Sequence, residues 1–191
     1  MKVAILGYGK SGKASEIILR NRGADVIEVF DDSLYGVKNI LDLDSKDFNL
    51  IVVSPGIDCK KYPMIDRDKV ISEIDLAYSL INDPEKIIVV TGTNGKSTTA
   101  YLLEQILHAF SRDAVLCGNI GKPFTDVVDK ERHDYYVVEL SSFQIELLKL
   151  FKAKRLIITN IDLDHLDRYE NFNNYIEAKL KVVNRIEDKG L

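Results

Sequence analysis

Residues 87–98 read IIVVTGTNGKST, in which apolar strand formers precede a glycine-punctuated turn and a Lys-Ser-Thr helix start. Backbone N–H groups from Gly92 to Lys96 can converge on an anion, and a helix beginning near Lys96 adds the positive end of its dipole. Lys96 offers an ammonium group to outer phosphates, and Ser97 offers a hydroxyl to Mg²⁺. The segment predicts a phosphate-binding loop, although Val90 stands where the GxxxxGK[ST] pattern has glycine. The alternative is an ordinary strand–turn–helix junction.

A second glycine loop, GYGKSG at residues 7–12, follows an apolar strand expected over 2–6 and opens a helix expected over 13–22. Asp31 follows at the end of a strand expected over 25–30. Glycines at this spacing let a backbone approach a pyrophosphate, and the acid can accept a ribose hydroxyl. These residues are compatible with NAD, with another nucleoside diphosphate, or with glycine used only for packing.

A third turn, Ser54-Pro55-Gly56, ends a strand expected over 49–53. The carboxyl ends of parallel strands line the ligand crevice of such sheets, so this turn can contact the ligand of the first loop. The alternative is a plain type II turn with proline at its second position.

Polar side chains also follow two later strands. Glu139 ends the strand expected over 135–140, where its carboxylate can bind Mg²⁺ directly or through water. The strand expected over 155–159 is followed by Asn160 and by a segment rich in carboxylates that contains His165. This segment is too polar for packing alone, although a solvated turn with a helix cap explains its aspartates.

Lys179 lies on the helix expected over 173–187. Helical spacing places it on one face with Tyr175, Val182 and Ile186. By spacing alone, such a lysine is expected to extend its ammonium group to solvent. The alternative is functional, because desolvation lowers a lysine pKa and a neutral amine can react with carbon dioxide. The resulting carbamate could bind a hard cation.

Bulk properties exclude several classes of protein. The chain has 191 residues, 46% of them apolar and 29% charged, which is ordinary for a globular protein of one large or two small domains. A net charge of −4 gives no field that attracts nucleic acid or anionic lipid. No run approaches the roughly 20 apolar residues of a membrane span. Cys59 and Cys117 lack metal-binding spacing, so we expect reduced thiols and a cytoplasmic protein without nucleic-acid or membrane partners.

The best candidate for a domain boundary is residues 82–85, where turn formers surround Pro84. Before it, a short strand at 70–71 leads into a helix that Ser72 caps and that ends near Ile81, with Glu73 in its first turn. After it, the strand–glycine turn–helix pattern begins again. We therefore predict domains at 1–83 and 84–191.

The second half is expected to have strands at 86–91, 114–117, 135–140 and 155–159 and a helix from Lys96 to about Phe110. The predicted buried stripe of that helix is Leu102, Leu103, Ile106, Leu107 and Phe110. Ile- and Val-rich strands separated by helices predict parallel sheets covered on both faces. The fold class is α/β, with a Rossmann-like domain before a truncated domain similar to P-loop NTPases.

Seven segments occur in order along nearly the whole chain: GYGKSG, SPGI, VVTGTNGKST, GNIG at 118–121, VVELSSFQ, TNIDLDHLDRY and YIEAK. Together they resemble the Mur ligases, and ELSSFQ with DHLDRY resembles the branch that uses D-glutamate. The resemblance implies an ATP-dependent ligation. The carboxylate of UDP-N-acetylmuramoyl-L-alanine attacks the γ-phosphate of ATP, and the amine of D-glutamate then takes the acyl phosphate. The first loop would bind the UDP group and the second ATP, with Mg²⁺ as cofactor.

The resemblance also implies roles by position. The residues implied for the UDP substrate are Lys10, Ser11, Asp31, Ser54, Pro55, Gly56, Asn119, Ser141 and Gln144. Those implied for ATP are Gly92, Thr93, Asn94, Gly95, Lys96, Ser97 and Thr98. Ser97 and Glu139 would bind one Mg²⁺, and His165 with carbamylated Lys179 a second. Lys96, Glu139, His165 and Lys179 form the implied catalytic set. The resemblance thus favours function over snorkelling at Lys179 and disfavours NAD.

Members of the family are more than twice as long as this chain, so the resemblance implies a partial chain that lacks the D-glutamate site and much of the adenine site. We expect weak binding of the UDP-muramoyl ligand, no completed ligation, exposed apolar edges on a short central sheet, and a monomer for the full-length form. Three rivals remain: an NAD-binding module joined to a P-loop regulator, a P-loop kinase or GTPase, and a non-catalytic binding protein.

Overall fold

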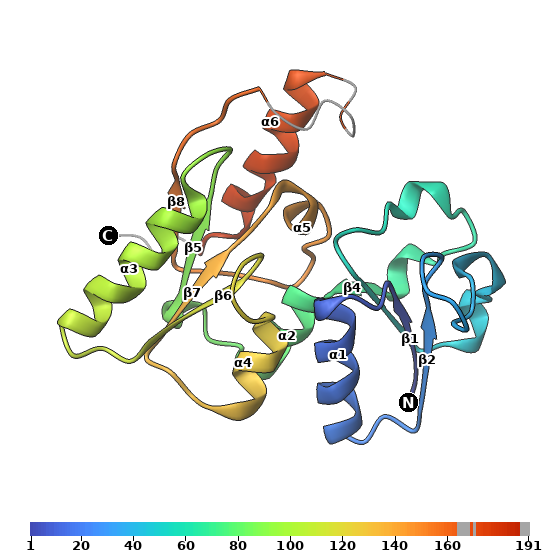
Figure 1. The fold of residues 1–191 in the computed structure, drawn as a ribbon. Coiled ribbons are helices and arrows are strands. Elements are labelled where there is room, and N and C mark those ends of the chain that lie inside the picture. Colours follow the sequence, from blue (N-terminus) through green and yellow to red (C-terminus); the bar gives the residue numbers. More distant parts are fainter. Residues whose placement is uncertain (164–168, 170, 188–191) are drawn as a thin grey trace.

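The computed structural model describes residues 1–163, 169 and 171–187, and it contains two four-stranded parallel sheets (Figure 1). The first sheet has the order β2-β1-β3-β4, built from β1 (Lys2–Leu6), β2 (Val26–Phe30), β3 (Leu50–Val53) and β4 (Val70–Ser72). The second has the order β6-β7-β5-β8, built from β5 (Ile87–Thr91), β6 (Ala114–Gly118), β7 (Tyr135–Glu139) and β8 (Arg155–Ile158). The predicted α/β class is confirmed.

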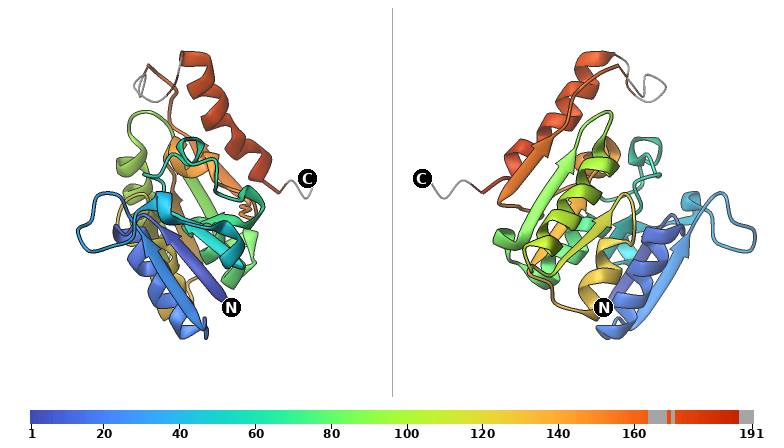
Figure 2. Two further views of the ribbon diagram at one scale, coloured as in Figure 1. Left: turned by 90° about the vertical axis from the view of Figure 1, so that its right-hand side faces the viewer. Right: turned by 60° about the vertical axis from the view of Figure 1, so that its left-hand side comes forward.

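The helices are α1 (Lys10–Asn21), α2 (Glu73–Ile81), α3 (Lys96–Ala109), α4 (Phe124–Lys130), α5 (Ser142–Glu146) and α6 (Phe172–Leu180). Short 3₁₀ turns occur at Ile40–Asp42, Ser45–Asp47, Cys59–Lys61, Arg67–Lys69, Pro84–Lys86 and Lys181–Arg185. Helices α1, α2 and α4 contact one another between the two sheets, whereas α3 packs on the second sheet and α5 contacts α6 (Figures 1 and 2).

Helix α1 begins at Lys10, three residues before the predicted start. The prediction treated all of GYGKSG as a turn, but Gly12 lies inside the helix. A Cβ atom on Gly12 would clash with the Gly7 carbonyl oxygen. Glycine at this position therefore lets the first turn of α1 pass directly over the loop that precedes it.

Helix α6 is shorter than the predicted helix over 173–187. It ends at Leu180 and continues as a 3₁₀ turn to Arg185. The backbone then pairs with a distant residue, since Ala153 N–H donates to the Arg185 carbonyl at 2.9 Å and Glu187 N–H donates to the Ala153 carbonyl at 2.9 Å. These tertiary bonds replace the helical bonds that local sequence favours.

The predicted buried stripe of α3 is wrong for three of its five residues. Leu102, Ile106 and Phe110 are between 52% and 77% exposed. The helix instead turns Ala100, Leu103 and Leu107 toward the sheet, and of its residues only Ala100 is fully buried. Two adjacent apolar faces merge in the sequence of α3, and only one of them can face the sheet.

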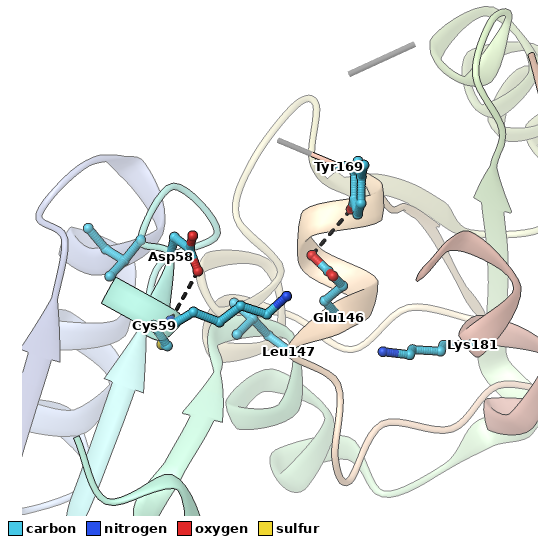
Figure 3. Close-up of a pocket in the computed structure, with 8 residues that line it drawn as sticks. Asp58, Cys59, Glu146, Leu147, Tyr169 and Lys181 are labelled. Carbon is cyan, nitrogen blue, oxygen red and sulfur yellow. Dashed lines mark hydrogen bonds between the residues drawn. The ribbon is translucent and has the colours of Figure 1, made fainter. Parts of the chain in front are cut away.

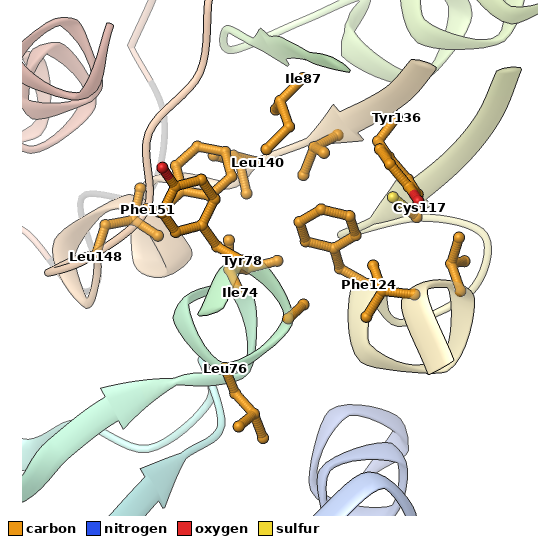
Figure 4. Close-up of a cluster of buried hydrophobic side chains, with 14 of the residues drawn as sticks. Ile74, Leu76, Tyr78, Ile87, Cys117, Phe124, Tyr136, Leu140, Leu148 and Phe151 are labelled. Carbon is orange, nitrogen blue, oxygen red and sulfur yellow. The ribbon is translucent and has the colours of Figure 1, made fainter. Parts of the chain in front are cut away.

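One hydrophobic cluster spans both halves of the chain (Figure 4). Ile74 and Tyr78 of α2 pack with Phe124, Tyr136 and Phe151 from the second half. Two ring pairs in this cluster meet edge to face, Tyr78–Phe151 with centroids 5.7 Å apart and Phe124–Tyr136 at 5.5 Å. Helix α2 follows the first sheet in sequence, and its side chains connect the apolar residues of the two halves in one core.

Cys59 and Cys117 are both buried, and neither forms a disulfide among the described residues. In the part of the chain that the structure describes, no helix combines the length and the apolar character needed to cross a membrane.

Candidate functional site

The first glycine loop opens into a cavity of about 490 Å³ at the carboxyl ends of β1, β2 and β3. Its lining includes all six residues of the first half that were predicted to bind the UDP substrate, namely Lys10, Ser11, Asp31, Ser54, Pro55 and Gly56. The remaining lining residues are Gly7, Gly9, Asp32, Ser33, Ile57 and Tyr62. The order of strands in a parallel sheet explains the grouping, since these residues follow neighbouring strand ends.

Asp31 anchors the first loop. One carboxylate oxygen accepts the Tyr8 N–H at 2.6 Å, and the other accepts the Ser33 N–H at 2.9 Å and hydroxyl at 2.6 Å. Burial raises the pKa of Asp31, but these hydrogen bonds together outweigh burial and leave its pKa below the ordinary value. Asp31 thus stays ionised and positions the loop, which is a different use of its oxygens from the ribose contact that spacing suggests.

Ser54 and Tyr62 form the opposite wall of this cavity. The Ser54 hydroxyl donates to the Gly7 carbonyl at 2.7 Å, which ties the end of β3 to the glycine loop. The Tyr62 hydroxyl donates to Asp32 at 2.6 Å, and this bond, with burial, raises the pKa of Tyr62 to about 12. Neither Tyr62 nor Ser33 could be predicted from the sequence as a lining residue, because no motif marks the turn after β2 or the loop after Gly56.

A second cavity, of about 330 Å³, joins the two halves. It shares Lys10, Ser11 and Pro55 with the first cavity. Its other lining residues come from the second half: Gly118, Asn119, Ile120, Gly121, Pro123 and Gln144. The structure therefore brings Asn119 and Gln144 to the first glycine loop, and their contact with a substrate stays a prediction.

Ser141 does not line either cavity. It is the N-cap of α5, where its hydroxyl donates to the Gln144 side-chain oxygen at 3.1 Å and accepts the Gln144 N–H at 3.3 Å. This reciprocal pair is a capping box, which fixes the start of α5 and the position of Gln144. In this structure Ser141 therefore positions Gln144, and its contact with a substrate stays a prediction.

The phosphate-type loop precedes α3, which starts at Lys96 after a left-handed Gly95. Two of its predicted anion donors are already used, because the N–H groups of Thr93 and Asn94 donate to Asn160 at 2.9 Å each. The first N–H groups of α3 have no acceptor within the helix, so the N–H groups of residues 96–98 are the donors that an anion at this loop would meet. The sequence did not reveal that Asn160 accepts the N–H groups of Thr93 and Asn94.

Two lysine ammonium groups contact carbonyl oxygens of this loop. Lys96 donates to the Thr93 carbonyl at 2.7 Å, and Lys179 donates to the Gly92 carbonyl at 2.8 Å. Lys179 is only 2% exposed, and its nitrogen lies 4.9 Å from the centroid of the Tyr175 ring. The snorkelling interpretation of Lys179 is wrong, because the side chain points into the protein and reaches the phosphate-type loop.

Glu139, which the resemblance assigns to Mg²⁺, is a fully buried carboxylate. One oxygen accepts the Asn119 side-chain N–H at 2.8 Å, and the other has no hydrogen-bond partner among the described residues. A buried carboxylate oxygen without a donor is costly, and a cation or its bound water would satisfy it. Glu139 thus fits an Mg²⁺ ion that is held partly by water, and the exposed hydroxyl of Ser97 at the start of α3 is a second oxygen ligand that fits the ion.

Two further observations concern the residues that were predicted to bind metal. Within residues 1–163, 169 and 171–187, no group of three or more His, Cys, Asp or Glu side chains is arranged to bind a metal ion. The predicted ligand His165 lies outside the described residues.

A further hollow, of about 220 Å³, lies between the turn at Cys59–Lys61, the end of helix α5 and the 3₁₀ turn that follows α6 (Figure 3). It is lined by Ile57, Asp58, Cys59, Lys60, Glu146, Leu147, Tyr169 and Lys181. The Tyr169 hydroxyl donates to Glu146, the last residue of α5, at 3.2 Å. Ile57 also lines the first cavity, so this hollow adjoins it. No motif in the sequence predicts this hollow.

Two glycine loops, each following the central region of a parallel sheet and each leading into a helix, are typical of α/β nucleotide-binding proteins. Residues 90–191 match the Mur ligase middle domain, which is more than half of the chain, and the chain therefore belongs to the Mur ligase family. Relatives named UDP-N-acetylmuramoylalanine--D-glutamate ligase are similar over nearly all of the chain. The protein from Caldicellulosiruptor bescii is 38% identical over 211 residues, covering 98% of this chain and 46% of the relative. That from Francisella philomiragia is 37% identical, covering 98% and 45%.

The chain thus spans less than half the length of these relatives. Among solved structures, the UDP-N-acetylmuramate:L-alanyl-gamma-D-glutamyl-meso-diaminopimelate ligase from Neisseria meningitides aligns with a TM-score of 0.60 at 15% identity, covering 99% of this chain and 69% of that chain. MurF ligase from Thermotoga maritima, solved with ADP, aligns with a TM-score of 0.51 at 17% identity, covering 97% and 40%. At these identities the likeness supports the fold of both halves.

Proposed function

We propose that the chain is the part of a UDP-N-acetylmuramoyl-L-alanine:D-glutamate ligase that binds the UDP substrate and ATP. Residues 1–83 would form the UDP-binding domain and residues 84–191 part of the ATP-binding domain. The observation that carries the proposal is the pair of cavities that share Lys10, Ser11 and Pro55. A ligand long enough to extend from a nucleoside diphosphate to Asn119 and Gln144 would occupy both.

At the UDP end, the ligand would lie along the first glycine loop. Lys10 and Ser11 are in the first turn of α1, where helix N–H groups and an ammonium group favour a diphosphate. Asp31 would stabilise the loop through the Tyr8 N–H. The muramoyl-alanine end would extend past Pro55 toward Asn119 and Gln144, whose side-chain amides can bind hydroxyl and carbonyl oxygens.

At the ATP end, the start of α3 would receive the phosphates. Lys96 would leave the Thr93 carbonyl and pair with phosphate oxygens instead. Bound Mg²⁺ would supply charge neutralisation at the phosphoryl oxygens. Glu139 and Ser97 would hold one ion, and His165 with carbamylated Lys179 a second. A carbamylated Lys179 would keep one N–H that can still donate to the Gly92 carbonyl.

The proposed reaction has two steps. The substrate carboxylate attacks the γ-phosphorus of ATP and ADP leaves; the amine of D-glutamate then attacks the acyl carbon, phosphate leaves, and an amide forms. Lys96 would stabilise the charge on the transferred group. Because the chain spans less than half of its relatives, we expect it to bind both nucleotides but not to complete ligation. The proposal includes a cytoplasmic location and a monomeric full-length enzyme.

Calorimetry on the 191-residue chain tests this proposal. Titration with UDP-N-acetylmuramoyl-L-alanine and, separately, with ATP and Mg²⁺ should give two independent sites, and NAD should not compete at the first. Binding of NAD but not of UDP at the first loop would contradict the proposal and favour a dinucleotide-binding module. Phosphate release that depends on both ATP and D-glutamate at a normal rate would contradict the expected inactivity of this chain.

A further inference from the structure

Two buried carboxylates lie in the first turn of α2, at the junction between the halves. Glu73 and Asp75 follow β4 directly, and both side chains are almost fully buried. Acidic residues in a first helical turn ordinarily face the N–H groups of their own helix or solvent. Here Glu73 accepts hydrogen bonds from another helix. Asp75 accepts hydrogen bonds both from its own N-cap residue and from a distant segment, so tertiary contacts explain why the two carboxylates are buried.

Glu73 caps a helix 52 residues further along the chain. One of its oxygens accepts both the N–H of Thr125, at 2.6 Å, and the Thr125 hydroxyl, at 2.8 Å. Thr125 lies in the first turn of α4, whose own N-cap residue is Pro123 and provides no side-chain cap. A carboxyl oxygen at a helix start accepts hydrogen bonds from the orphan N–H groups, and when ionised it also opposes the positive end of the dipole. Glu73 therefore supplies from α2 the cap that α4 lacks.

The loop that leads into α4 lines the second cavity. Residues Gly118 to Pro123 contribute most of the second-half wall, including Asn119. Gly118 and Gly121 both have positive φ, at +100° and +71°, so this short loop contains two residues with few intrinsic conformational limits. Its far end is fixed where Glu73 holds Thr125. Its near end is fixed where Asn119 bonds Glu139.

Asp75 holds the other part of the same wall. Its oxygens accept the consecutive N–H groups of Lys149, Leu150 and Phe151 at distances from 2.8 to 3.1 Å. This segment closely follows α5, which carries Gln144 into the second cavity. The same carboxylate also accepts the Ser72 hydroxyl at 2.9 Å, which connects it to the end of β4. One helical turn thus contacts both elements that present polar side chains to the ligand.

We infer that Glu73 and Asp75 are positioning residues that fix the second-half wall of the substrate cavity against the first half. The inference rests on the proposed function. The muramoyl end of the ligand would depend on them, because it would contact the elements they hold. The UDP end would not, because the first cavity is built from β1, β2, β3 and the loops that follow those strands.

The test compares Glu73→Ala and Glu73→Gln with a matched control, Val128→Ala. Val128 is buried in the same helix, α4, but does not bond the helix start. Calorimetry with UDP and with UDP-N-acetylmuramoyl-L-alanine measures the two ends of the site separately. For Glu73→Ala we expect roughly tenfold weaker binding of the muramoyl ligand, because two buried hydrogen bonds to Thr125 are lost, with UDP binding unchanged. Val128→Ala should lower the melting temperature while leaving both affinities unchanged.

Amide hydrogen exchange supplies a readout that needs no ligand. In Glu73→Ala, residues 118–125 should exchange faster than in the wild type, whereas in Val128→Ala this loop should keep its protection. Glu73→Gln retains a carbonyl oxygen for the Thr125 N–H, so it should restore part of the protection and part of the affinity. Asp75→Asn should similarly expose residues 149–151.

The outcomes separate this inference from the proposed function. Unchanged exchange at 118–125 together with unchanged binding of the muramoyl ligand in Glu73→Ala would overturn the inference. Failure of the wild type to bind UDP-N-acetylmuramoyl-L-alanine would overturn the proposed function instead, and the exchange data would still decide whether Glu73 fixes the loop. If Glu73→Ala does not fold, Glu73→Gln and Thr125→Val provide the same comparison with smaller packing changes.

Discussion

The two glycine loops of this chain have the same local pattern but opposite surroundings. The first loop faces a cavity of about 490 Å³, and Asp31 and Ser54, which also line that cavity, bond its backbone. The backbone of the second loop is hydrogen-bonded to other residues of the protein. Asn160 accepts two of its N–H groups, and Lys96 and Lys179 donate to two of its carbonyl oxygens. None of the cavities described above is lined by Gly92 to Thr98.

This difference indicates that the two loops differ in how much they must rearrange to bind an anion. The first loop is shaped before a ligand arrives, so binding there requires little rearrangement. At the second loop, the proposed function requires Lys96 to exchange its carbonyl partner for a phosphate, while the buried Lys179 bonds the Gly92 carbonyl. A site of the second kind depends more on individual charged side chains. A site of the first kind depends more on backbone shape.

The largest effects are expected from filling the space at the glycines. A Cβ atom on Gly92, where φ is +146°, would clash with the Thr159 hydroxyl, and one on Gly12 would clash with the Gly7 carbonyl. Urea unfolding should give losses of about 4 kcal/mol for Gly92→Ala and about 3 kcal/mol for Gly12→Ala, from clash and, at Gly92, backbone strain.

The matched controls are Gly95→Ala and Gly9→Ala, since a Cβ atom at either position has no heavy atom within 4 Å. Gly95 has φ of +79°, so Gly95→Ala should lose about 1 kcal/mol from backbone strain alone, and Gly9→Ala less than that. If Gly92→Ala were as stable as Gly95→Ala, the second loop would not be packed against its neighbours, and the contrast between the loops would fail.

Removing one charged or polar side chain from each loop tests whether they serve different nucleotides. Lys96→Ala should weaken ATP binding about 100-fold, near 2.7 kcal/mol, because a lysine–phosphate interaction is lost. Ser11→Ala should leave ATP binding unchanged and weaken UDP binding by a smaller factor, about fivefold for one neutral hydrogen bond. Calorimetry with each nucleotide measures both variants. A loss of both nucleotides in either variant would mean that the loops form a single site.

The pH dependence of stability isolates the carboxylate that connects the halves. Burial raises the pKa of Glu73 to about 7 from an ordinary 4.5, against the lowering effect of hydrogen bonds from Thr125. Asp126 of α4 and the Cys117 thiol of β6 face it, and burial raises the pKa of that thiol as well. Between pH 4.5 and 7 the folded chain binds more protons than the unfolded chain, so stability falls as pH rises through this window.

The expected fall from Glu73 is about 2 kcal/mol between pH 5 and pH 7. Glu73→Gln removes this titration, so the stability of the variant relative to the wild type should increase by that amount over the same range. Urea unfolding at several pH values measures the difference. Glu131→Gln, exposed at the end of α4, is the control and should run parallel to the wild type. Parallel curves for Glu73→Gln would show that Glu73 does not titrate in this window.

The smallest effect is expected at the wall of the first cavity. Tyr62→Phe removes the hydrogen bond to Asp32, which should lower the free energy of unfolding by about 1 kcal/mol and weaken UDP binding a few-fold. ATP binding should not change. Tyr101→Phe, on the exposed face of α3, is the matched control. Ultraviolet titration should also lose the tyrosine with a pKa of about 12. Equal effects on UDP and ATP would argue against separate sites.

Much of the fold could be predicted because its strands are short, apolar and bounded by turns. All eight strands lie within a residue or two of their expected positions, and the helix capped by Ser72 ends at Ile81 as predicted. The residues after β1, β2 and β3 could be grouped because parallel strands end on one edge of a sheet. The burial of Lys179 could not be settled by spacing, since snorkelling and burial produce the same pattern.

The sequence by itself determined where the glycine loops lie, which residues end the strands and which side chains carry charge, because these depend on backbone preferences over a few residues. Tertiary structure decided which face of α3 meets the sheet, that Asn160 occupies the amides of the second loop, and that Glu73 caps α4 rather than its own helix. Each of these depends on contacts between residues many positions apart. Such contacts follow from the packing of whole elements, which the spacing of residues within one element does not reveal.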